Sequence, residues 1–111
     1  MTQIQLLKGT LDMLVLKALS GESKHGYDII EWVRGRSKGT LEIDDAALYQ
    51  SLHRLEDRGC LRSEWGRSEN NRHAKYYALT ARGRKELAAE DQNWRKYAEA
   101  VFSVMGGERA E

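Results

Sequence analysis

The sequence predicts a mainly α-helical protein with a small β-hairpin and a long C-terminal helix. Apolar residues recur at helical spacing through most of residues 6–58, whereas residues 61–79 show the alternating pattern of strands. A helical pattern returns after Thr80. A chain of 111 residues has the length of one compact unit. We expect residues 1–80 to form the main domain and residues 81–111 a final helix and tail.

The first predicted helix, within residues 6–20, is apolar on more than one side. One stripe follows the helical period and comprises Leu7, Leu11, Leu14, Val15, Ala18 and Leu19. Leu6, Met13 and Leu16 lie outside this stripe. A helix that is apolar on two sides needs cover on both, and a chain this short can hardly surround it. The pattern therefore favours a partner subunit.

Two further helices are predicted, with a short extended piece at 41–43 between them. The second covers about residues 25–37 and buries Ile29, Ile30 and Val33. The third starts after Asp44, a good N-cap residue, and ends before Gly59, a residue typical of the position after a helix C-terminus. Its inward residues are Leu48, Leu52 and Leu55.

The change of period after Gly59 predicts a β-hairpin. Its strands are expected at 61–65 and 74–79, with a polar loop at 66–73. Thr80 is the expected N-cap of a helix over Ala81–Met105. A helix pair followed by such a hairpin is a helix-turn-helix with a wing. The predicted fold class is therefore a winged helix-turn-helix with a long C-terminal helix.

The distribution of charge favours a nucleic-acid partner, although the net charge is only +1. Residues 53–85 carry nine Lys or Arg against four Asp or Glu. This basic stretch contains the end of the third helix and the hairpin. In a helix-turn-helix the third helix enters the major groove of DNA with the outward side chains of its first turns. The candidate DNA-binding residues of this helix are Tyr49, Gln50, His53 and Arg54.

Gln50 is the residue expected to read a base, because glutamine pairs bidentately with adenine. Tyr49 suits a phosphate oxygen or a thymine methyl group. The alternative is that Tyr49 packs at the junction of the helices and that Gln50 is only solvated.

The hairpin supplies a second set of candidate DNA contacts, Arg67, Arg72, His73 and Lys75. Basic side chains on a hairpin suit phosphates or a narrow, electronegative minor groove. The alternative is an ordinary soluble loop. We favour DNA contact because we expect the loop to lie beside Arg54 and Arg58.

Other chemistry has little support in the sequence. The three histidines are far apart and have no cysteine near them, so we expect no metal site. No phosphate-binding glycine loop or nucleophile–base arrangement is recognisable, so we expect neither enzymatic activity nor a cofactor. Cys60 is the single cysteine, and neither a secretory signal nor a membrane span is apparent. These features predict a cytoplasmic protein.

The last helix is the expected centre of a homodimer. Its apolar residues recur near the 3.5-residue spacing of helices that pack on other helices. The predicted interface comprises Leu6, Met13, Leu16, Leu87, Trp94, Ala98, Val101 and Met105. A pair of Trp94 side chains could form a flat slot for a small effector. Packing of Trp94 in the dimer core is at least as plausible an interpretation.

Four segments together resemble the PadR family of bacterial transcriptional regulators: 11–16 (LDMLVL), 25–27 (HGY), 48–59 (LYQSLHRLEDRG) and 75–83 (KYYALTARG). The resemblance implies a winged helix-turn-helix homodimer joined through its first and last helices. It also implies binding to palindromic operators, often repression, and in some members relief by small, frequently aromatic effectors. The single final helix is similar to that of the compact subgroup.

This chain departs from the family pattern at the start of the third helix. Gln50 replaces the usual proline, and Ala46 and Ala47 replace Gly-Thr or Gly-Ser. These departures concern DNA sequence specificity rather than the fold. An alternative function is a winged-helix dimer that serves as a protein-interaction module without operator binding. The basic stretch favours the DNA-binding regulator.

Overall fold

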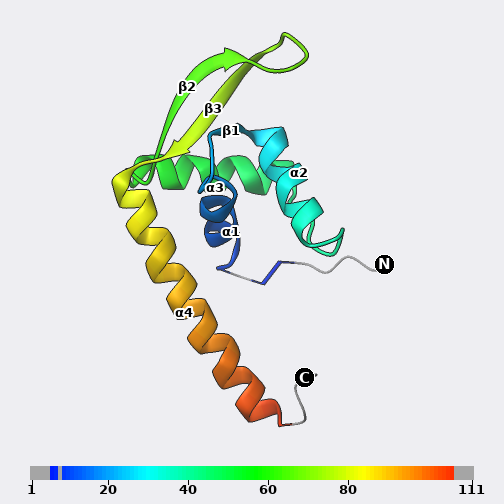
Figure 1. The fold of residues 1–111 in the computed structure, drawn as a ribbon, viewed down its shortest axis with the longest axis vertical. Helices are drawn as coiled ribbons and strands as arrows, with labels where there is room; N and C mark the ends of the chain where they lie inside the picture. The colour runs from blue at the N-terminus through cyan, green and yellow to red at the C-terminus, as the bar shows by residue number, and fades with distance from the viewer. Residues whose placement is uncertain (1–5, 8, 107–111) are drawn as a thin grey trace.

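The computed structural model describes residues 6–7 and 9–106, and the rest of the predicted domain and tail lies outside the described residues. The elements follow in the order α1 (Leu11–Ala18), β1 (Lys24–His25), α2 (Gly26–Arg36), α3 (Asp45–Asp57), β2 (Leu61–Arg67), β3 (His73–Leu79) and α4 (Ala81–Met105). α2 and α3 form the helix-turn-helix and β2–β3 the wing (Figure 1). The predicted winged fold and its long last helix are confirmed.

The hydrophobic core lies among α1, α2, α3 and the base of the hairpin. Leu48, Leu52 and Leu55 are at most 1% exposed, which confirms the predicted inward side of α3. α4 extends away from this body (Figure 1), and Gly83 is its only buried residue. The far end of α4 is therefore left without cover from its own described chain.

The first helix is shorter than predicted. α1 begins at Leu11, because Gly9 adopts a φ of +89° and Thr10 forms a turn back to Leu7. The Thr10 amide and hydroxyl both donate to the Leu7 carbonyl, at 3.1 and 2.8 Å. Leu7 is 63% exposed. The helical spacing of apolar residues thus extends to Leu7, but Gly9 favours a turn there and the helix begins only at Leu11.

The sheet has a third strand that the sequence analysis missed. β1 pairs antiparallel with β3, which lies between β1 and β2. Lys24 lies opposite Tyr77 and His25 opposite Tyr76. A strand of two residues is too short to show a period, and its pairing depends on residues about fifty positions away. The extended piece predicted at 41–43 is not a strand of this sheet.

The wing strands are longer, and the loop shorter, than predicted. Pairing continues through Gly66–Ala74 and Arg67–His73, so the loop contains only residues 68–72. The Ser68 amide donates to the Arg72 carbonyl, and the Asn71 amide to the Ser68 carbonyl, each at 2.9 Å. Asn71 has a φ of +60°, a conformation that asparagine tolerates. Because the turn is tight, the hydrogen-bonded pairing of β2 and β3 continues into polar residues that the sequence pattern assigned to the loop.

The predicted helix caps are confirmed. The Asp44 carboxylate accepts from the Ala47 amide at 3.3 Å, and the Thr80 hydroxyl accepts from the Gly83 amide at 3.0 Å. Gly59 has a φ of +79° after α3, and the Cys60 amide returns to the Leu55 carbonyl at 2.9 Å. This is the glycine-terminated helix end that the sequence predicts.

One junction joins α3, the wing and α4. The Thr80 hydroxyl donates to the Gly59 carbonyl at 2.6 Å, and the Thr80 amide to the Cys60 carbonyl at 3.1 Å. Gly83 packs so closely that an added Cβ would lie 2.1 Å from the Cys60 carbonyl oxygen. The start of α4 is therefore fixed directly on the end of the helix-turn-helix.

Candidate nucleic-acid interface

The outer side of α3 carries the candidate base-reading residues. Tyr49, Gln50 and His53 are exposed, while the leucines of the same helix are buried. The His53 Nε2 lies 3.4 Å from the Asp57 Oδ2, one helical turn further along α3. Gln50 lies in the second turn of α3, within the N-terminal half of the helix from which a recognition helix contacts base edges. The geometry is therefore compatible with major-groove entry by α3.

Tyr49 is exposed and also packs at the junction of the helices. Its side chain is 53% exposed. An added Cβ on Gly26 would lie 2.6 Å from the Tyr49 hydroxyl oxygen and 3.4 Å from a Leu48 methyl group. The phenol therefore lies against the first residue of α2. Gly26 of the His-Gly-Tyr segment provides the space for this contact.

Gly26→Ala is expected to displace Tyr49 with little effect on folding. The obstructing atom is the far end of a flexible side chain, so the phenol can swing away at a cost of about 1 kcal/mol or less. If Tyr49 contacts DNA, the variant should lose about fivefold in affinity, comparable with one lost hydrogen bond. Fluorescence anisotropy with labelled duplex measures the affinity, and thermal melting checks the fold. Unchanged affinity would show that the position of Tyr49 does not matter for binding.

Arg54 and Arg58 do not lie where the sequence analysis expected them. The Arg54 Nη2 donates to the Asp12 Oδ1 at 2.7 Å, and the Arg58 Nη2 to the Glu86 Oε2 at 2.8 Å. Asp12 also accepts from the Ser51 hydroxyl at 2.5 Å. The two arginines connect α3 to α1 and α4 at the base of the wing. The expectation that they flank the wing loop is wrong.

Glu86 of α4, the partner of Arg58, also hydrogen-bonds to Glu90 one turn further along the helix. Hydrogen bonding with Glu90, and then with Arg58, holds the pKa of Glu86 below its ordinary value. Partial burial, followed by hydrogen bonding with Glu86, raises the pKa of Glu90. Hydrogen bonding to Glu86 also raises the pKa of Arg58. The charge on Glu86 thus favours the connection between the end of α3 and α4.

The wing residues gather instead around a cleft of about 640 Å³ between the hairpin and the start of α2. Arg72, His73 and Lys75 line it together with Tyr49. Arg67 does not line this cleft, and its guanidinium donates to the Asn71 carbonyl at 3.2 Å across the loop. Three of the four predicted DNA contacts of the wing therefore line the same cleft as Tyr49 of α3.

Sequence analysis missed two exposed aromatic residues of this cleft. Trp65 and Tyr27 line it and are 63% and 66% exposed. Tyr27 lies in the family-like segment at 25–27, and Trp65 ends the strand predicted at 61–65, and neither position by itself indicates a cleft. By the strand period Trp65 should face inward like Leu61, and only the fold shows that it is exposed.

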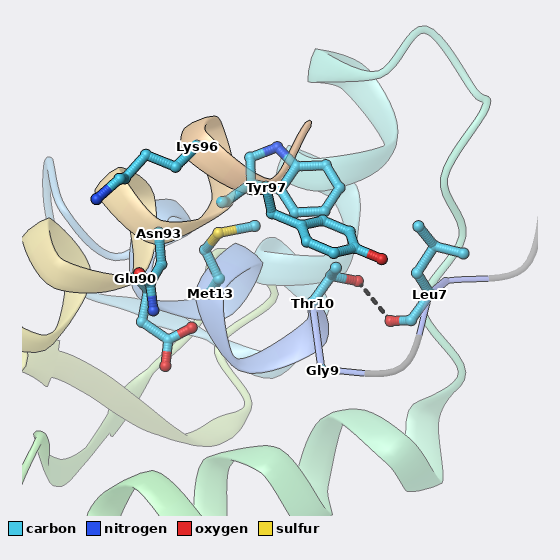
Figure 2. Close-up of a pocket in the computed structure, with 9 residues that line it drawn as sticks. Leu7, Gly9, Thr10, Met13, Glu90, Asn93, Lys96 and Tyr97 are labelled. Atoms are coloured by element: carbon cyan, nitrogen blue, oxygen red, sulfur yellow. Dashed lines mark hydrogen bonds between the residues drawn. The ribbon is translucent and has the colours of Figure 1, made fainter. Parts of the chain in front are cut away.

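A second groove, of about 800 Å³, lies between the start of α1 and α4. Figure 2 shows Thr10 and Met13 from the α1 side facing Asn93 and Tyr97 of α4. Trp94 lines this groove as well, and its ring centroid is 6.2 Å from that of Tyr97. The predicted interface residue Met13 therefore meets Trp94 at one site.

The other predicted interface residues differ in how exposed they are within the single chain. Val101 and Met105 are 40% and 75% exposed, and Ala98 is partly exposed. Leu6 and Leu87 are half-buried and pack against the core of their own chain. Leu16 is 0% exposed within the single chain, so its assignment to the subunit interface is wrong. α1 turns this side chain into the core because α2 and α3 cover it.

Within residues 6–7 and 9–106, no group of three His, Cys, Asp or Glu side chains is arranged to hold a metal ion. The same residues contain no helix that is both long and apolar enough to span a bilayer.

The comparisons with known proteins agree with this geometry. Residues 15–89 match the family described as "Transcriptional regulator PadR-like family". The chain belongs to this family. A solved PadR family transcription regulator from Clostridium difficile is 28% identical, with a TM-score of 0.76 over 88% of this chain and all of that one. This PadR-like chain is therefore a transcriptional regulator by family.

Two further similarities extend over most of the chain. A transcriptional regulator from Clostridium thermocellum shares the fold, with a TM-score of 0.81, 24% identity and coverage of 89% of this chain and 93% of that one. A protein of Lysinibacillus sphaericus, described as uncharacterized, is 25% identical over 96% of this chain and 98% of its own length. The PadR-like chain thus matches whole relatives rather than a fragment of them.

Proposed function

We propose that this PadR-like chain binds double-stranded DNA as a homodimer and represses transcription from a palindromic operator. One observation carries the proposal. The exposed side of α3 and the cleft formed by the basic wing meet at Tyr49. α3 would enter the major groove, while Arg72, His73 and Lys75 contact the backbone or the adjacent minor groove. Residues 1–80 would supply DNA binding and residues 81–111 dimerisation.

The rival function is a protein-interaction module without operator binding. Basic side chains on the wing favour DNA, because a protein-interaction module has no need for such a surface. Strong retention on heparin at low salt is expected for the DNA-binding function.

The dimer is supported by the uncovered end of α4. Tyr97, Phe102, Val104 and Met105 are all more than half exposed. Exposed apolar side chains gathered on one helix are typical of a protein interface. We propose that a second copy packs on α4 and on the groove beside Met13, and that the two α3 helices then face successive half-sites.

We also propose that Trp94 contacts a small aromatic effector that releases the operator. The support is the groove itself, in which Trp94 and Tyr97 present adjacent rings beside the polar groups of Glu90 and Asn93. Aromatic compounds should quench tryptophan fluorescence and release bound duplex in parallel. Quenching that does not release DNA would contradict the regulatory role.

DNA binding is expected to depend strongly on salt. If each subunit neutralises about three or four phosphates, the log–log slope for the dimer should be about −5 to −7. Lys75→Ala should weaken binding to all sequences about equally and make the slope shallower by about 2 for the two subunits. Anisotropy titrations across a salt series measure both quantities. An affinity that does not change with salt would favour the protein-interaction function.

Gln50 is expected to discriminate between bases. A bidentate glutamine–adenine pair contributes about 1–3 kcal/mol of discrimination. Gln50→Ala should therefore relax preference at one base pair in each half-site, with nonspecific affinity nearly unchanged. Selection of binding sites from random DNA, run on both proteins, measures the recovered motif.

Tyr49→Phe is the matched control for that selection. It removes a hydroxyl that we assign to a phosphate, so it should lower affinity for all sequences and leave the motif intact. An unchanged motif with Gln50→Ala would show that Gln50 is only solvated.

A further inference from the structure

One carboxylate of α1 holds α3 along two of its turns. The Asp12 Oδ1 accepts from the Ser51 hydroxyl at 2.5 Å and from the Arg54 Nη2 at 2.7 Å, and the Asp12 Oδ2 lies 4.0 Å from the Arg58 Nη1. Ser51 is fully buried, and the Asp12 side chain is only 19% exposed. Hydrogen bonds to a carboxylate are stronger than those between neutral groups. Three donors of α3 therefore share one strong acceptor on α1.

These contacts limit rotation of α3 about its own axis. Residues 51, 54 and 58 lie within about 60° of one another around the helix, so their side chains leave α3 on the same side. A rotation of α3 relative to α1 would separate all three donors from Asp12. It would also turn Gln50, the next residue before Ser51, by the same angle. The direction in which α3 presents its outer side is therefore fixed relative to α1.

A second carboxylate, on α4, holds the end of α3. The Glu86 Oε2 accepts from the Arg58 Nη2 at 2.8 Å, about one turn after Gly83 packs against the Cys60 carbonyl. The Gly83 contact fixes where α4 begins, and the Glu86 contact adds the second point that sets its direction. The 25 residues of α4 make it about 37 Å long, so a tilt of about 10° at its start would move its far end by roughly 6 Å.

We propose that Asp12 and Glu86 are positioning residues that set the spacing between the two half-sites of the operator. The inference rests on the proposed function, in which α1 and α4 join the subunits and each α3 reads one half-site. The two carboxylates connect each α3 to the helices of the subunit interface, so they fix the distance and the angle between the two α3 helices. One added base pair moves a half-site by about 3.4 Å and rotates it by about 35°. A dimer with firmly held α3 helices cannot follow this change without losing contacts.

The test measures affinity for duplexes that carry the selected half-site twice, separated by spacers of different lengths. The full-length parent should prefer one spacer over those one base pair longer or shorter by about tenfold or more, as it would reject a mismatched base pair. Asp12→Asn and Glu86→Gln keep the size of each side chain and remove its charge. Each should lower this preference to about threefold, because a charge-assisted hydrogen bond is lost, and leave the half-site motif unchanged. Glu86 is partly exposed, so Glu86→Gln should fold even if Asp12→Asn does not.

Two control variants match the side effects of these changes. Asp91→Asn removes the same charge from an ion pair with Arg95 inside α4, where the two groups are 2.8 Å apart. Ile30→Val trims the core and should lower the melting temperature by about 5 °C, as Asp12→Asn should. Both controls leave Asp12 and Glu86 in place, so both should keep the spacer preference of the parent.

The outcomes separate this inference from the proposed function. A relaxed preference in Asp12→Asn and Glu86→Gln, with the controls unchanged, is the expected result. A spacer preference that both variants share with the parent would overturn this inference alone. Equal relaxation in Ile30→Val would also overturn it, because lost stability would then be the cause. A parent that binds no paired half-sites at any spacing would overturn the proposed function together with this inference.

Discussion

Gly83→Ala is expected to destabilise the protein by about 3 kcal/mol or more, close to the upper range for overpacking a core. The new Cβ would lie 2.1 Å from the Cys60 carbonyl oxygen and 3.1 Å from its carbon. Both are backbone atoms that cannot rotate away. The same residues carry the Thr80 hydrogen bonds, so α4 would have to separate from the wing. Thermal melting should show a loss of roughly 10–20 °C.

Gly35→Ala is the matched control. Gly35 lies in α2, is exposed, and would have no atom within 4 Å of an added Cβ. Alanine is the better helix former, so this variant should gain about 0.5–1 kcal/mol. A Gly83→Ala protein as stable as the parent would show that α4 is not held by this contact.

Val101→Glu is expected to abolish the proposed dimer. In a symmetric helix pair the substitution buries two carboxylates near each other without partners, which costs about 4 kcal/mol or more and lowers the association constant roughly a thousandfold. Adding Trp94→Glu should leave only monomeric or unfolded chain. Sedimentation measures the association, and circular dichroism the folded fraction. Operator affinity should fall in parallel, because one subunit then reaches only one half-site.

Ser103→Glu provides the control for adding a carboxylate to the same helix. Ser103 is exposed, and it lies two residues from Val101, about 200° around α4. It should leave the dimer intact. A well-folded monomer of the unmodified chain would contradict the dimer outright.

Features that depend on residues close together in the chain could be predicted from the amino-acid sequence. Asp44 and Thr80 cap their helices as predicted, and α4 has the predicted bounds Ala81–Met105. A cap involves residues three positions apart, and a buried stripe needs only the helical period. The order of helices, hairpin and final helix was sufficient to predict the winged fold. The four quoted segments were sufficient to predict the family.

Contacts between residues far apart in the chain could not be predicted in this way, because they depend on how the elements pack. Arg54 finds Asp12, 42 positions away, and Arg58 finds Glu86, 28 positions away. β1 forms because β3 presents an open edge, and Tyr49 rests on α2 because Gly26 has no side chain. No local pattern encodes such pairs, because their partners are brought together by the packing of whole elements. For the same reason, Leu16 belongs to the core and Trp65 to the cleft.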